Sequence, residues 1–549
     1  MKNISIALLM IIMFASCKQH PVADQVVFGK VWTGDDQTPW AEGFAIVGDS
    51  IVAVGSVNEM KQWIGKETQK IETASENLIV PGFIDCHTHF MEGGFALASV
   101  QLRDAKTPQE FIKKIKEFAS TQPKGSWITS GDWDHENWGG ELPSRSWIDS
   151  VTMDNPVWIN RLDGHMCLAN TAALKVAGID DHVKDIDGGT IVRDTKGKIT
   201  GVFKDNAMNM IYKIVPDPSD EQKDKALEQA MNYVAARGVT STHNMSGYMD
   251  VFERARVKNA LKTRVYAGMA LSEWRELNKK IIKQGRGDKW LRIGGLKEFV
   301  DGSLGSHTAA FFKPFTDAPA DSGFFITPEK ELYRRIKSAD SAGLHIMTHA
   351  IGDKAIHTLL NIYEQVSKEN GERDRRFRIE HAQHIDPNDI PRFAKLNVIP
   401  SMQPYHAIDD GRFAERLIGS ERIKTTYAFG SLLKANAKLA FGSDWFVAPP
   451  TPLEGIYAAV TRQTLDGKNP DGWVPEQKIS VEDALKCYTI RAAFASFEEN
   501  IKGSIRQGKL ADFVILEKNL FEIQPSEIRN VKVLQTAVGG KFVYSANYT

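Results

Sequence analysis

The chain has 549 residues, of which 42% are hydrophobic and 25% are charged. This composition is that of an ordinary soluble globular protein, and the length predicts about two to four structural units. The 68 basic and 69 acidic residues leave a formal net charge of −1, and no run of lysines and arginines forms a basic patch. We therefore expect no nucleic acid as a partner.

The first residues have the pattern of an export signal. Lys2 precedes an apolar run over 4–14, which is too short to span a bilayer, and small residues then lead to Cys17. The Ala15-Ser16-Cys17 ending resembles a bacterial lipobox, although Phe14 stands where that pattern prefers Leu. The resemblance implies removal of residues 1–16, lipidation of Cys17 and anchoring in the bacterial cell envelope, on the periplasmic or outer-membrane face. The alternative is a plain signal peptide followed by a coincidental cysteine. Elsewhere no run approaches about 18 apolar residues, so the lipid is the one membrane contact expected.

The remaining cysteines are Cys86, Cys167 and Cys487. Their odd number and wide spacing are not those of a disulfide framework. We expect three buried free thiols.

Both ends of the chain read as short strands separated by turns. Residues 25–80 contain apolar runs at 26–28, 44–47 and 51–54, and residues 503–549 contain three more, at 512–516, 531–534 and 541–544. We predict a small β-sandwich domain built from residues 17–78 and 503–549.

The middle of the chain alternates strands with amphipathic helices. A helix is predicted over 220–237, with an apolar face and Gly238 as its stop. Eight strand candidates follow one another, and eight such strands are typical of an α/β (β/α)₈ TIM barrel. We assign residues 79–450 to the barrel and 451–502 to its C-terminal helical segment. The candidates lie at 78–84, 238–243, 265–270, 293–299, 344–349, 378–381, 398–403 and 439–443.

Residues 91–219 break this alternation and are predicted to be a large insertion after strand 1. The insertion has strand candidates of its own at 126–130 and 156–162, and it holds five of the twelve tryptophans. Because loops after barrel strands build the active-site face, we expect the insertion to roof the pocket, with Trp133 among the substrate-binding residues. The alternative is that these rings form the core of the insertion.

The first barrel strand leads into His87-Thr88-His89. Side chains at i and i+2 of a strand point to the same side, so both imidazoles can bind one first-row metal ion. Alone, the pattern also fits a polar strand terminus without metal. Other predicted strands strengthen the metal interpretation. Lys297 interrupts an apolar strand, and His349, His381 and Asp444 stand at the ends of three further strands.

The order His-x-His, Lys, His, His, Asp resembles the amidohydrolase superfamily. Local strings resemble its amidohydrolase-3 branch, which includes N-substituted formamide deformylases, and they extend over nearly the whole mature chain. These strings are PGFIDCHTH (81–89), DGSLGSHTAA (301–310), HAIGDKA (349–355), RIEHAQ (378–383), GSDW (442–445) and GSIRQGKLADF (503–513).

The resemblance implies a divalent metal site with one or two ions per chain, with zinc expected and iron or manganese as alternatives. His87, His89 and Asp444 would hold one ion, and His349 and His381 a second. Lys297, carboxylated on its amine, would bridge them, since a carbamate is an anionic ligand whereas an ammonium is repelled by metal cations. The alternatives are an outward-pointing lysine, or a lysine beside a one-metal site.

The resemblance also implies the catalytic groups. Asp444 would act as general base and proton shuttle, or else bind metal only. Arg161 and His165, in the insertion, would contact the substrate carbonyl, with His165 also counted as catalytic; the alternative is a surface loop.

We therefore expect a metal-dependent amidohydrolase that hydrolyses the C–N bond of a non-peptide or cyclic small-molecule amide by metal-activated hydroxide. Two alternatives remain open, a lactonase or ester hydrolase with the same site, and a non-catalytic envelope lipoprotein that uses the barrel as a binding scaffold. The sequence is compatible with a homo-oligomer and does not name the substrate.

Overall fold

The computed structural model describes residues 22–546, so Cys17 and the signal segment lie outside the described residues. Its central element is a sheet of eight parallel strands, in chain order around the sheet. The sheet closes through a parallel bridge between Thr88 and Trp445, and the backbone N–H of Asp444 donates to the carbonyl of His87 at 2.7 Å. The predicted α/β barrel is confirmed. Its strands are β6 (Phe83–Thr88), β12 (Val239–Asn244), β13 (Arg264–Ala270), β14 (Leu291–Phe299), β15 (His345–Ala350), β16 (Arg378–His381), β17 (Ile399–Met402) and β18 (Ala440–Phe441).

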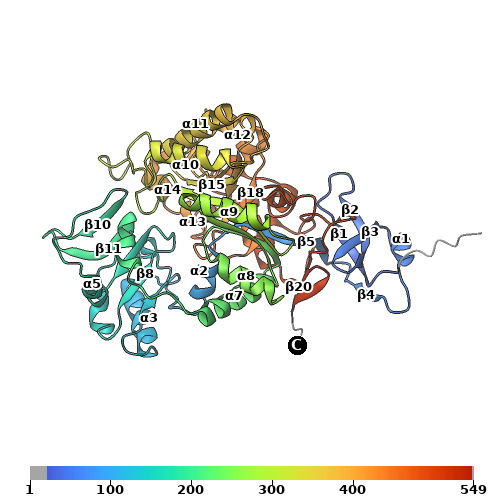
Figure 1. Cartoon of the computed structure of the whole chain (residues 1–549), viewed down its shortest axis with the longest axis horizontal. Helices are drawn as coiled ribbons and strands as arrows, with labels where there is room; N and C mark the ends of the chain where they lie inside the picture. Colours follow the sequence, from blue (N-terminus) through green and yellow to red (C-terminus); the bar gives the residue numbers. More distant parts are fainter. Residues whose placement is uncertain (1–21, 547–549) are drawn as a thin grey trace, which may run out of the picture.

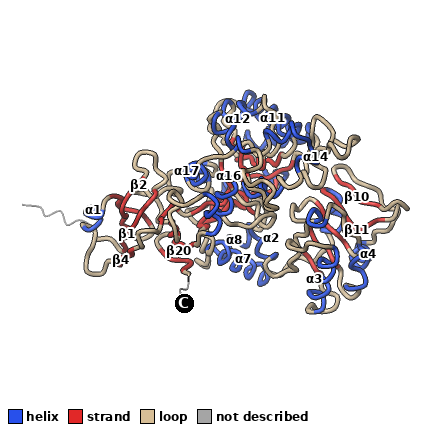
Figure 2. The backbone as a smooth tube through the Cα atoms, turned by 180° about the vertical axis from the view of Figure 1, so that it is seen from behind, coloured by secondary structure: helices blue, strands red, loops and turns tan. Residues whose placement is uncertain are grey.

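Helices cover the outside of this sheet, as the two opposite views show (Figures 1 and 2). Helix α7 (Asp220–Ala235) begins at Ser219 with a capping box, and it buries the apolar face that the sequence predicts. It ends two residues before the predicted Arg237, and Gly238 follows with a φ of +81°. The other helices between and after the barrel strands are α8 (Met249–Val257), α9 (Trp274–Gln284), α10 (Glu329–Ser341), α11 (Asp353–Asn370), α12 (Ile390–Lys395), α13 (Pro404–Asp410), α14 (Ala414–Arg422), α15 (Phe429–Lys434), α16 (Pro452–Thr461), α17 (Val481–Cys487) and α18 (Ile490–Phe494).

Strands from both chain ends form one eight-stranded sheet. The two ends meet where β5 (Leu78–Pro81) pairs antiparallel with β19 (Phe513–Leu516). The description of this sheet as a sandwich stays a prediction. The remaining strands are β1 (Gln25–Trp32), β2 (Trp40–Val47), β3 (Ser50–Gly55), β4 (Gln69–Glu72), β20 (Val533–Val538) and β21 (Lys541–Ser545), with the short helix α1 (Val57–Lys61) after β3.

The segment after β6 forms a unit with its own five-stranded sheet and its own hydrophobic core. It lies on the opposite side of the barrel from strands β1 to β4, at the left in Figure 1 and at the right in Figure 2. Its elements, with the helix α2 that precedes it, are α2 (Phe90–Ala96), α3 (Pro108–Ser120), β7 (Ile128–Thr129), α4 (Arg145–Ile148), β8 (Val157–Asn160), β9 (Met166–Ala169), α5 (Thr171–Ala177), β10 (Gly189–Arg193), β11 (Ile199–Asp205) and α6 (Asn209–Tyr212).

Two further expectations concern the cysteines and the membrane-spanning segments. Cys86, Cys167 and Cys487 are buried free thiols, as the sequence predicts. Among the described residues, none of the helices combines the length and the apolar character needed to span a bilayer.

Candidate metal centre and active site

Three of the predicted ligands come together where barrel strands end. His87 lies on β6, His381 ends β16, and Asp444 follows β18. One ligand atom from each lies within 4.8 Å of the others, and all three residues are buried. Carboxyl ends of barrel strands meet at one face, so segments some 300 residues apart in the chain supply a single cluster.

His87 is oriented by a buried ion-paired glutamate. Its Nδ1 lies 2.6 Å from Glu380 Oε2, and Arg378 Nε lies 2.7 Å from Glu380 Oε1, with all three side chains fully buried. Burial alone would raise the pKa of Glu380, but Arg378 and His87 lower it to about 2. An ionised Glu380 accepts the proton of Nδ1, which leaves the lone pair of His87 Nε2 directed at the cluster.

Asp444 and His89 lie next to His87 at the cluster. Asp444 Oδ1 lies 3.3 Å from His87 Nε2 and 3.4 Å from His89 Nε2, and His89 Nδ1 lies 2.7 Å from Ser246 Oγ. Among the residues that the structure describes, Asp444 Oδ1 and His381 Nδ1 are buried and have no hydrogen-bond partner. Burial also lowers the pKa of His381 well below its usual value, so this imidazole is neutral. Buried polar atoms without partners are costly, and a cation would satisfy them, so these residues fit a divalent metal.

Lys297, on β14, points into the barrel mouth. Its Nζ lies 3.4 Å from His87 Nε2 and 4.5 Å from the centre of the Phe299 ring, and the residue is 5% exposed. Burial lowers its pKa to about 8. The alternative of an outward-pointing lysine is therefore wrong, while a lysine beside a one-metal site stays open.

His349 lies beside the cluster but outside it. Its ring centre is 4.5 Å from that of His381, and its Nε2 lies 3.0 Å from the carbonyl of Gly302. Asp301, which holds this loop by accepting three backbone N–H groups, lies 3.6 Å from the same nitrogen. The loop after β14 thus sets the orientation of the His349 ring.

His165 reaches the metal centre from the insertion. Its ring centre lies 5.1 Å from that of His349, and its Nδ1 lies 2.7 Å from Asp205 Oδ1. Burial alone would lower the pKa of His165, but the Asp205 carboxylate outweighs burial and raises it. The side chain is 12% exposed, so the surface-loop alternative does not hold for His165.

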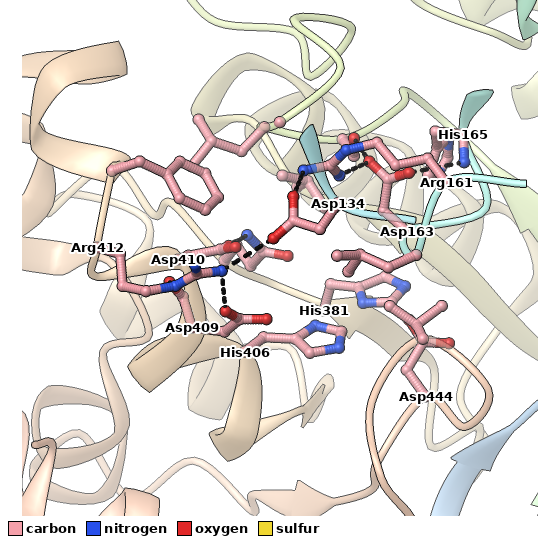
Figure 3. Close-up of a pocket in the computed structure, with 18 of the residues that line it drawn as sticks. Asp134, Arg161, Asp163, His165, His381, His406, Asp409, Asp410, Arg412 and Asp444 are labelled. Carbon is pink, nitrogen blue, oxygen red and sulfur yellow. Dashed lines mark hydrogen bonds and ion pairs between the residues drawn. The ribbon is translucent and has the colours of Figure 1, made fainter. Parts of the chain in front are cut away.

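Arg161 lines a cavity at this site, although its guanidinium is already engaged (Figure 3). It lies 3.1 Å from Asp134 Oδ1 and 2.7 Å from Asp163 Oδ2, and its Nε donates to His135 Nδ1. It is 3% exposed and organises the wall of the cavity. The arrangement leaves little of its donor capacity for a substrate carbonyl. The contact between Arg161 and the substrate carbonyl, which the resemblance implies, stays a prediction.

Trp133 requires a correction. The ring is fully buried in the hydrophobic core of the insertion, its Nε1 donates to the carbonyl of Ile159 at 3.0 Å, and it lines neither cavity at the site. Tryptophan is amphipathic, and here the apolar interior takes the ring while a backbone carbonyl satisfies its N–H. The expectation that Trp133 contacts substrate is wrong, and the alternative of a core residue holds.

Residues 72–544 match the family model described as the amidohydrolase family. The chain belongs to the amidohydrolase family. This membership supports a hydrolase, and the His87, His381 and Asp444 cluster supports a divalent metal.

Relatives of this amidohydrolase span nearly the whole chain. Protein LONG AFTER FAR-RED 3 of Arabidopsis thaliana is 41% identical, over 95% of this chain and 92% of that protein. N-substituted formamide deformylase of Arthrobacter pascens is 26% identical, over 94% and 98%. The crystal structure of an uncharacterized metal-dependent hydrolase from Pyrococcus horikoshii OT3 is similar with a TM-score of 0.74 and 26% identity, covering 91% of this chain and 99% of that one.

Sequence reasoning missed several residues of the amidohydrolase site. Glu380 could have been found, because Arg378 and Glu380 are charged residues at i and i+2 of a strand that is otherwise buried. No local pattern points to Asp205, Asp410 or Arg412. Asp205 contacts His165 within the insertion, and Arg412 contacts Asp134 from the barrel side. Asp410 lines the same cavity and is held by Tyr427 and Gln383.

Proposed function

We propose that this chain hydrolyses the C–N bond of a non-peptide amide or cyclic amide with a metal-dependent site. The observation that carries this proposal is the buried cluster of His87, His381 and Asp444, in which two buried polar atoms have no hydrogen bond within residues 22–546. The chain also belongs to the amidohydrolase family, and N-substituted formamide deformylase of Arthrobacter pascens is among its relatives.

We propose zinc as the metal, with His87, His89, Asp444, His349 and His381 as its protein ligands and carboxylated Lys297 as a bridge between two ions. The pKa of Lys297 near 8 supports the bridge, because only a neutral amine can take up carbon dioxide. Once bound, a divalent metal lowers the pKa of a coordinated water and polarises a carbonyl.

The residues around the metal supply the proton chemistry. Asp444, which reaches the cluster through Oδ1, would accept a proton from the attacking water and deliver it to the leaving nitrogen. His165, whose pKa is raised by Asp205, would offer an N–H to the carbonyl oxygen as negative charge develops there. Arg161 would hold Asp134 and Asp163 in the cavity wall.

The test is a comparison of N-formyl amines, N-acyl amines and hydantoins with esters and lactones of matching shape, on the zinc-loaded protein. We expect the amides to be cleaved and activity to be lost with a chelator. A preference for lactones would favour the ester hydrolase, and a protein that binds no metal would favour the scaffold.

We also propose that Cys17 carries a lipid that anchors the enzyme in the bacterial envelope. The support is the apolar run over 4–14 followed by Ala15-Ser16-Cys17.

A further inference from the structure

Two cavities meet at the metal centre. Their shared wall includes His165, His349, His381 and Asp444. A substrate with its scissile carbonyl at this wall would extend into both cavities. The lining of each cavity therefore indicates the chemistry of one end of that substrate.

The larger cavity has a volume of about 280 Å³. Beyond the shared wall, its apolar lining side chains come from the insertion and from the barrel mouth, and they are Met208, Tyr212, Phe299, Ile326 and Phe446. Its polar side chains there are His89, Glu92, Asp205, Asn206 and Lys297. A hydrocarbon or aromatic group fits the apolar part of this lining.

The second cavity is lined by charged side chains (Figure 3). Arg161 pairs with Asp134 and Asp163, and Arg412 pairs with Asp134, at 3.1 Å, and with Asp409. Three of the carboxylates are therefore ion-paired within the wall. His381, with its unpartnered and buried Nδ1, also faces this cavity, which makes the cavity part of the reacting site.

Asp410, at the end of α13, differs from these carboxylates. Among residues 22–546 no Lys, Arg or His nitrogen pairs with it, while Tyr427 donates to its Oδ2 at 2.6 Å and Gln383 at 3.0 Å. Both hydrogen bonds reach Oδ2 and leave Oδ1 for a ligand. Tyr427 and Gln383 hold the carboxylate in place, so a ligand would meet an oriented acceptor.

We propose that Asp410 determines substrate specificity by binding a protonated amine, so that the substrate carries a cationic group at one end and an apolar group at the other, with the scissile amide between them. This inference rests on the proposed function and adds a substrate class to it. An ammonium offers the N–H donors and the positive charge that Asp410 lacks within the protein.

The experiment uses two sets of amides that differ at one end. In the first set, phenylacetic acid is joined to 1,3-diaminopropane (cationic), to butylamine (neutral) or to β-alanine (anionic). In the second set, benzylamine is joined to 4-aminobutanoic acid or to pentanoic acid, which places the cationic group on the acyl side. The kcat/KM of each amide is measured for the zinc-loaded protein, for Asp410→Asn and for Glu415→Gln. Glu415 is an exposed glutamate that follows Asp410 closely in the chain, so Glu415→Gln controls for the loss of one negative charge.

In at least one set, we expect the cationic amide to exceed its neutral partner about tenfold or more, as a charged hydrogen bond would allow. Asp410→Asn should bring this ratio close to one, and Glu415→Gln should keep the ratio. A ratio near one in the wild type, or one that survives Asp410→Asn, overturns the inference.

The two proposals fail in different ways. If none of the amides is cleaved, the proposed function is wrong, and dissociation constants of the same amides on the zinc-loaded protein then decide the role of Asp410. Tighter binding of the cationic amide that is lost in Asp410→Asn supports the inference, and equal binding of the cationic and neutral amides contradicts it.

Discussion

The Nδ1 of His87 lies 2.6 Å from Oε2 of Glu380, and both side chains are fully buried. A carboxylate in this position fixes the tautomer and the plane of an imidazole that is to bind metal through its other nitrogen. Arg378 holds Glu380 in turn, with its Nε 2.7 Å from Oε1.

Glu380→Gln should therefore weaken metal binding. The glutamine amide can donate its N–H₂ group to His87 Nδ1, so the proton of His87 is no longer held on that nitrogen. We expect metal affinity and activity to fall by about 10- to 100-fold. Competition with a chelator measures the affinity directly. Glu421→Gln, which changes an exposed glutamate, is the matched control. Unchanged metal affinity in Glu380→Gln would show that Glu380 serves packing alone.

Lys297 tests the two-metal site. If it is a bridging carbamate, Lys297→Ala should lose most activity and one metal equivalent per chain, and acetate or propionate should restore part of both by occupying the vacated bridge. Elemental analysis and activity with and without the acid provide the measurement. Equal metal content near one per chain in wild type and variant, with no rescue, contradicts the bridge and leaves a one-metal hydrolase.

Trp133 should behave as a core residue. Because the ring is fully buried in the core of the insertion, Trp133→Ala should cost about 3–5 kcal/mol of stability in this unit. Relative activities on different amides should stay the same for the protein that remains folded. Thermal unfolding and the substrate panel check both points, with the more exposed Trp40→Ala as control. A changed substrate preference at normal stability would restore the substrate-binding role.

The preference for a cationic substrate should depend on pH through Asp410. Burial raises the pKa of this carboxyl to about 7, while the Tyr427 hydrogen bond lowers it, the neighbouring Asp409 raises it, and Arg161 and Arg412 lower it. A carboxyl with a raised pKa is neutral below that pKa and ionised above it. The ratio of kcat/KM for the cationic over the neutral amide should therefore rise from pH 6 to pH 8, about one unit to either side of the Asp410 pKa. The ratio removes pH effects common to both substrates. A ratio that stays flat in the wild type, or that rises equally in Asp410→Asn, contradicts the assignment.

Cys17→Ala tests the lipid anchor. We expect the variant to leave the membrane fraction while the wild type stays there, as shown by fractionation and by labelling with a fatty-acid analogue. Wild-type protein that is already soluble in the periplasm contradicts lipidation.

The barrel could be predicted from the sequence because its signals are local. Each strand shows as a short apolar run, and helix α7 shows its buried face through residues three and four positions apart. The order of possible metal ligands at the strand ends, from His87 to Asp444, can also be read from the sequence. Parallel strands of a barrel end at one face, so this order was enough to predict a metal centre there.

Tertiary structure alone decided how the side chains of the site are used. Glu380 meets His87 across 293 positions of sequence, Arg161 is engaged by Asp134 and Asp163, and Trp133 turns into the core of the insertion. Asp410 keeps an oxygen for a ligand because Tyr427 and Gln383 both reach its other oxygen. Periodicity in a sequence reports which face of an element is buried, whereas the partner of a buried charge depends on which distant elements pack against it.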